Sequence, residues 1–139
     1  MRFPTTLAML ALIGLPGQLH AADCSSASAT VEMNQCAEKE YAAADSELNA
    51  VYQATLAKIA KTTGEKPYDA KSWEAALRAS QRAWVGFRDA QCKGLVPMQW
   101  SGGTGSTSAV LNCMTTLTRE RVAMLKDGSS GLEGPARVP

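Results

Sequence analysis

The four cysteines are the residues of this chain most clearly suited to chemistry. They stand at positions 24, 36, 92 and 113, and no Cys-x-x-Cys pair, the spacing typical of redox-active dithiols and zinc sites, occurs among them. In an exported chain an even number of cysteines indicates disulfides. Of the three possible connectivities we favour Cys24 with Cys36 and Cys92 with Cys113. The first would pin the N-terminal segment to the first predicted helix, and the second would close a glycine-rich loop.

The first 21 residues have the features of a secretory signal peptide. Arg2 supplies a short positive region, residues 7–15 form an apolar run, and Pro16 breaks it. The run is shorter than the ~20 apolar residues that span a bilayer. Asp23, directly before the first cysteine, is not the small neutral residue that a lipoprotein signal requires. We therefore expect a periplasmic or secreted protein without a membrane anchor.

Removal of this signal changes the chemical repertoire of the chain. It takes away His20, the only histidine, and Arg2, which leaves 13 of the 14 basic residues against 13 acidic ones. A domain without net charge lacks the basic surface that nucleic-acid binding uses, so no nucleic-acid partner is expected. Without histidine it also lacks the most frequent general base and metal ligand. We expect no enzyme activity, no cofactor and no metal.

Carboxylates are the remaining candidates for chemistry. A glycosidase needs two of them across a sugar, one of them in an apolar setting, and the sequence sets no such pair apart. Glu38, Glu40 and Glu47 fall mostly on the polar face of a predicted helix. We expect them to be solvated charges that could steer a basic partner.

Asp45 has a different expected environment. It precedes Leu48 by three residues and so lies near the apolar edge of the same helix. Arg88 and Arg119 are the natural partners for its carboxylate. A structural ion pair is therefore favoured over a binding role.

Apolar residues recur at steps of three and four over residues 30–59, which is the period of one helix face. The same period returns over residues 70–92 and 108–126, and no alternation typical of strands is present. We predict an all-α fold, a small antiparallel bundle of about three helices stapled by two disulfides. The helical domain should span residues 22–128, and residues 129–139 should form a flexible tail.

The helices allow more local predictions. Ser28 or Thr30 can cap the first helix and Asp69 the second. Gly86, inside the second helix, costs about 1 kcal/mol relative to alanine, which suggests the close approach of a neighbouring helix. Aromatic side chains expected on the inward faces are Tyr41, Tyr52, Trp73, Trp84 and Phe87.

Residues 93–107 have the composition of a loop. They contain Pro97 and a glycine-rich run, which end helices. The simpler interpretation is a flexible surface connector. The alternative is that the loop, held at both ends by a disulfide, presents Met98 and Trp100 as apolar anchors to a partner.

The order and spacing of several residues resemble a known family. In the first half these are Asp23, Cys24, Glu32, Cys36, Tyr41, Asp45, Leu48, Asn49 and Tyr52. In the second half they are the run QRAWVGFRDAQC at residues 81–92, then Gly105, Ser106, Cys113, Thr116, Arg119 and Leu125. Together they resemble the LprI-type lysozyme-inhibitor domain over about residues 23–125.

The resemblance implies a small, exported, helical, disulfide-bonded bacterial protein without catalytic residues. Lysozyme inhibition is known for the family's namesake, so the expected function is a non-catalytic binding protein that occludes a lysozyme or a related cell-wall hydrolase. The candidate contact residues are Met98, Trp100, Glu38, Glu40 and Glu47. The alternative is a periplasmic structural or stress-linked module that binds another envelope protein or a cell-wall component.

Overall fold

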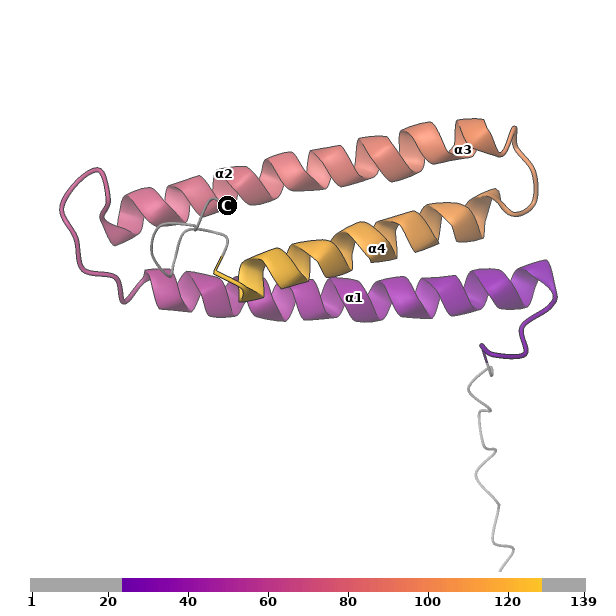
Figure 1. Ribbon diagram of the computed structural model, residues 1–139, viewed down its shortest axis with the longest axis horizontal. Coiled ribbons are helices and arrows are strands. Elements are labelled where there is room, and N and C mark those ends of the chain that lie inside the picture. Colours follow the sequence, from indigo (N-terminus) through magenta and orange to yellow (C-terminus); the bar gives the residue numbers. More distant parts are fainter. Residues whose placement is uncertain (1–23, 129–139) are drawn as a thin grey trace, which may run out of the picture.

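A computed structural model describes residues 24–128 as a bundle of helices (Figure 1). The elements are α1 (Thr30–Ile59), α2 (Ala70–Asp89), the π-helical turn η1 (Ala90–Leu95), α3 (Val96–Gln99) and α4 (Ser106–Lys126). Because α2, η1 and α3 follow one another without a break, the chain makes three antiparallel arms. The predicted all-α bundle is confirmed. The predicted signal peptide and tail lie outside the described residues.

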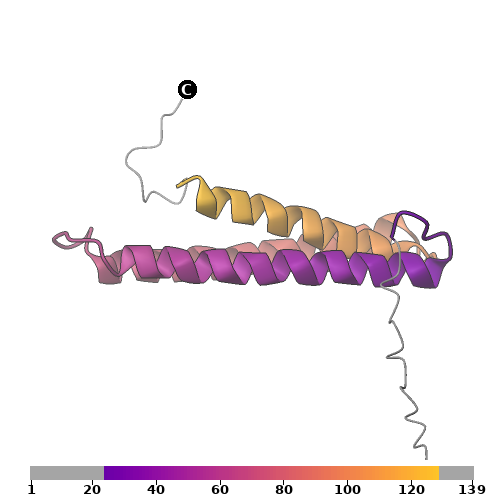
Figure 2. The same cartoon turned by 90° about the horizontal axis from the view of Figure 1, so that it is seen from below.

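α1 and α4 form the most closely packed pair of helices. Their buried side chains are largely small or β-branched, which lets two helix axes approach one another closely. The hydroxyls of Thr55 and Thr115 donate to the carbonyl oxygens of Val51 and Leu111, both at 2.9 Å. Figure 2 shows α4 on one side of α1 and α2. The buried small residues of the two helices include Ala37, Ala44, Thr55, Thr115 and Thr118.

α2 packs on this pair through larger side chains. Leu77 and Arg88 are its buried residues, while Trp73 and Trp84 pack against the core and remain half-buried. The prediction that Phe87 faces inward is wrong, since 56% of it is exposed. Arg88 takes the inward position, and the residue before it is turned away by about 100°. The apolar core comprises Leu48, Ile59, Leu77, Val122 and Leu125.

The helix caps are only partly as predicted. Asp69 caps α2, and its Oδ1 accepts a hydrogen bond from the backbone N–H of Ser72 at 3.0 Å. Neither Ser28 nor Thr30 caps α1. Instead the carboxylate of Glu32 reaches back to the backbone N–H of Ser28 at 3.2 Å. The same carboxylate accepts a hydrogen bond from the backbone N–H of the N-cap residue Ala29 at 3.2 Å, so an acidic side chain of the first turn holds the two residues that precede the helix.

The expected role of Gly86 is also wrong. A Cβ placed there would have no heavy atom within 4 Å, so no neighbouring helix approaches it. The glycine lies on the outer side of α2, where close packing makes no demand. Nothing in the structure explains why glycine rather than alanine stands at this position.

The predicted loop over residues 93–107 is wrong in its first half, because the chain stays helical to Gln99. In η1 the backbone N–H of Val96 donates to the carbonyl of Gln91, five residues earlier. Pro97 then falls in the first turn of α3. Proline is tolerated there because the first turn of a helix does not need its missing N–H. The connecting loop is therefore short, residues 100–105.

Candidate functional site

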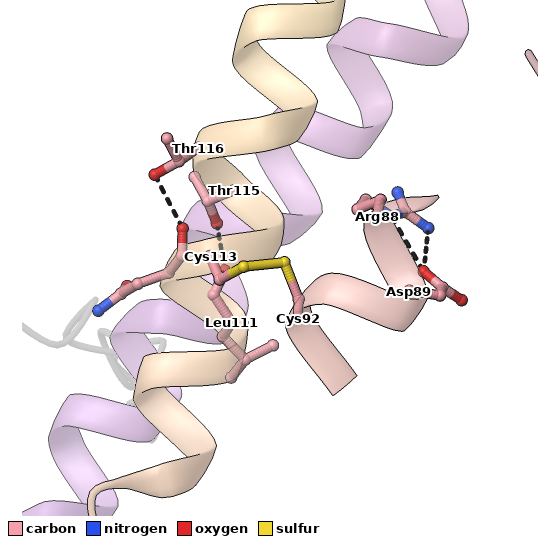
Figure 3. Close-up of a disulfide and its surroundings, with 8 residues drawn as sticks. Arg88, Asp89, Cys92, Leu111, Cys113, Thr115 and Thr116 are labelled. Atoms are coloured by element: carbon pink, nitrogen blue, oxygen red, sulfur yellow. Dashed lines mark hydrogen bonds and ion pairs between the residues drawn. A yellow bond between two sulfur atoms is a disulfide. The ribbon is translucent and has the colours of Figure 1, made fainter. Parts of the chain in front are cut away.

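One end of the bundle, which we call the tip, comprises residues 90–113: η1, α3, the short loop and the first turns of α4. The disulfide between Cys92 and Cys113 joins η1 to α4, with the two Cα atoms 5.6 Å apart (Figure 3). A second disulfide joins Cys24 to Cys36, at the start of α1. Both pairings are as predicted. The tip is thus a covalently closed structure on the end of a long bundle.

Apolar side chains are exposed on this tip. Met98 is 75% exposed, and Leu95 and Trp100 are each about half exposed. A Cβ at Gly105 would lie 2.2 Å from Cζ3 of Trp100, so the indole lies directly on this glycine. Only a residue without a side chain leaves room for the indole in this position. Leu95 lies in the same predicted loop as Met98 and Trp100 but was not singled out from the sequence.

An open groove of about 450 Å³ lies where the tip meets α1, between α1, η1 and α4. Val110, Leu111 and Met114 give it an apolar lining, and Glu38 and Lys93 stand among its polar groups. Three elements contribute to the groove, which explains why sequence reasoning did not find it. Its full lining is Glu38, Tyr41, Lys93, Ser106, Thr107, Val110, Leu111 and Met114.

The three acidic residues predicted to steer a partner do not form one patch. Glu40 forms an ion pair with Arg119, and Glu47 forms one with Lys126, so both carboxylates tie α1 to α4. Glu38 instead lines the groove. Two positions along a helix correspond to about 200° of rotation, which separates Glu38 from Glu40. Arg119 is therefore engaged by Glu40.

Arg88 lies at the junction of α1 and α2, with 9% of its side chain exposed. Its Nη1 is 3.6 Å from Oδ1 of Asp45, and its Nη2 is 3.1 Å from Oδ1 of Asp89. The guanidinium also stands over the rings of Tyr41 and Trp84, 5.7 and 5.1 Å from their centroids. This arrangement joins two helices and leaves the arginine no free donor face for a ligand.

The titratable groups around this junction are held in one charge state. A hydrogen bond from Lys93 and contact with Arg88 lower the pKa of Asp89, so it stays ionised. Burial raises the pKa of Tyr41, so its hydroxyl stays protonated. Within residues 24–128 no three His, Cys, Asp or Glu side chains come together as metal ligands.

A comparison with protein families adds an independent observation. The model of the family described as lysozyme inhibitor LprI matches residues 21–125. The chain belongs to the LprI family. The match to LprI includes all four cysteines and the whole tip. It therefore applies to nearly all of the described structure.

A bacterial protein is similar to most of this chain. A protein of Rhizobium meliloti (strain 1021), described as uncharacterized, is 38% identical over 108 residues, which are 76% of this chain and 77% of the relative. No solved structure matches the chain. Among the helices described, none is long and apolar enough to cross a membrane.

Proposed function

We propose that this protein is an exported, non-catalytic inhibitor that binds a lysozyme or a related muramidase through its tip. The observation that carries the proposal is the LprI match, which spans the domain that builds the tip. Two disulfides and the features of a signal peptide support export to an oxidising compartment, the periplasm or the exterior. Inhibition then requires only that the bound protein blocks access to the polysaccharide.

The geometry of the tip supports this mode of binding. Met98 and Trp100 are exposed, and both residue types are enriched in the buried cores of protein interfaces. Tryptophan is also enriched among the residues that carry most of the binding energy. The disulfide between η1 and α4 limits the freedom of this segment before binding, which lowers the entropy lost on association. The apolar groove between the tip and α1 offers a place for a side chain of the enzyme.

In this proposal we assign charge a smaller role than in the expectation from the sequence. Lysozymes are usually basic, and Glu38 takes part in none of the ion pairs found among the described residues. It can therefore contribute to steering such an enzyme toward the groove. Glu40 and Glu47 already face basic residues of α4. Reversing them to lysine would place like charges together and is expected to weaken the fold as well as association.

Turbidity assays with several muramidases, including cell-wall hydrolases of the bacterium itself, test the proposal. We expect the mature protein to inhibit at least one of them reversibly, with one-to-one stoichiometry, and without any effect of chelators. Inhibition that builds up irreversibly with time would contradict a purely binding mechanism. If no muramidase is bound at micromolar concentration, the alternative of a structural or stress-linked envelope module replaces this proposal.

A further inference from the structure

Four lysines gather at the end of the bundle opposite the tip. Lys58 and Lys61 lie at the end of α1, Lys66 lies in the connection to α2, and Lys71 lies in the first turn of α2. Figure 1 shows this connection, in magenta, at the opposite end from α3. All four side chains are exposed. We call residues 58–71 the basic end.

The charges of the basic end are not neutralised as others in the bundle are. None of its four lysines takes part in the ion pairs found among the described residues. The two carboxylates in this stretch are Glu65 and Asp69, and the second caps α2. The basic end thus contains four lysines and only two carboxylates, although the mature chain as a whole has no net charge. Elsewhere the paired basic residues are Arg78, Arg88, Lys93, Arg119 and Lys126.

An exposed aromatic residue, Tyr68, lies in the same segment of the chain as these lysines. Tyr68 is 71% exposed, although the connection that carries it is compact. Its backbone N–H donates to the carbonyl of Glu65 at 2.8 Å, and a Cβ at Gly64 would come within 2.8 Å of its carbonyl oxygen. A tyrosine has an apolar ring and a polar hydroxyl, the combination enriched at the boundary between membrane and water.

We propose that the basic end binds the surface of an anionic lipid bilayer. The lysines would contact headgroup phosphates, and the ring of Tyr68 would enter the interface between headgroups and acyl chains. The tyrosine is the reason to prefer a bilayer over a soluble polyanion, since a polyanion needs charge alone. Binding of this kind is peripheral and reversible. The tip stays free for another partner, because it lies at the far end of a 30-residue helix that is about 45 Å long.

Co-sedimentation of the mature protein with vesicles tests this proposal. Vesicles of phosphatidylglycerol and phosphatidylethanolamine in equal parts should bind the protein, and vesicles of phosphatidylcholine should not. Each lysine near an anionic surface contributes about fivefold to the partition coefficient. We therefore expect Lys58→Gln with Lys66→Gln to lower the coefficient about 25-fold, and Tyr68→Ser to lower it further.

The matched control is Lys39→Gln with Arg82→Gln. Both side chains are exposed and outside the described ion pairs, and both lie away from the basic end. This control removes the same charge and should leave vesicle binding nearly unchanged. Circular dichroism checks that all variants fold.

Three results would overturn the proposal: no binding to the anionic vesicles at low salt, an equal loss in the control variant, or an unchanged coefficient for Tyr68→Ser together with full competition by soluble polyphosphate. The vesicle measurement involves no muramidase, so its outcome is separate from that of the inhibition assays.

Discussion

At the residue scale, Arg88 explains why the run at residues 81–92 is distinctive. Trp84 lies one turn before it and stacks on its guanidinium, and Asp89 and Asp45 pair with it. A buried cation needs such partners, because leaving it unpaired would cost several kcal/mol. Cys92 follows one turn later and is bonded to α4. The run is therefore a structural joint between all three arms.

Asp89 makes the stability of this joint dependent on pH. Its pKa is lowered in the folded chain by the hydrogen bond from Lys93 and by Arg88. A lowered folded pKa adds stability that is present above the unfolded value, about 4, and is lost as the pH falls through the folded pKa. We expect the free energy of unfolding to fall below about pH 4, and to fall less steeply in Asp89→Asn.

Urea unfolding at a series of pH values measures this effect. Glu120→Gln is a suitable control, because it also removes a carboxylate but touches none of the described ion pairs. The same pH dependence in Asp89→Asn and in the wild type would show that the joint does not contribute to acid sensitivity.

At the scale of elements, the π-helical turn η1 has the largest effect on the tip. A π turn holds one residue more than an α turn, and it therefore rotates everything that follows about the helix axis. It lies between Arg88, which faces α1, and Pro97, which begins α3. Such a turn leaves no clear trace in a 3.6-residue pattern. The sequence therefore predicts a helix end here, where the structure has a change of helix type.

The two disulfides should contribute about equally to the stability of the fold and unequally to partner binding. Their separations of 12 and 21 residues give each about 3 kcal/mol on the loop-entropy model. We therefore expect Cys24→Ala with Cys36→Ala, and Cys92→Ala with Cys113→Ala, to lower the free energy of unfolding by similar amounts. Partner binding should weaken much more in the second variant, because only that disulfide holds the tip.

Denaturant unfolding and a binding assay, both at a temperature where the variants remain folded, separate the two effects. Equal losses of binding in the two disulfide variants would mean that the tip needs no covalent closure.

At the scale of the whole molecule, the sequence predicts those features of the fold that depend on residues close together in the chain, such as the bounds of a helix. The bounds of α1 agree with the predicted residues 30–59, because the apolar period and the terminal charges lie in or next to this segment and the breaker around Gly64 follows it closely. The side on which Phe87 lies and the surroundings of Gly86 were predicted wrongly. Both depend on which neighbour each face of α2 meets, and a helix pattern alone does not specify this.

The candidate site, like the fold, could be predicted only in part from the sequence. Exposed Met98 and Trp100 could be predicted from a constrained, glycine-rich segment. The separation of Glu38 from the pairs formed by Glu40 and Glu47 could not, because it requires the positions of Arg119 and Lys126 on another helix. The groove requires three elements at once. What sequence reasoning missed thus arises from contacts between helices.

The most direct test of a tip-docked inhibitor is a dissociation rate, measured for the muramidase that the wild type inhibits most strongly. Met98→Ala with Trp100→Ala should raise this rate about tenfold or more with little change in association, as expected for central apolar contacts. The control, Val85→Ala with Phe87→Ala, removes exposed apolar side chains of α2 and should dissociate like the wild type. A wild-type dissociation rate in the tip variant would contradict docking through the tip, and fast dissociation in the control would indicate a contact on α2 instead.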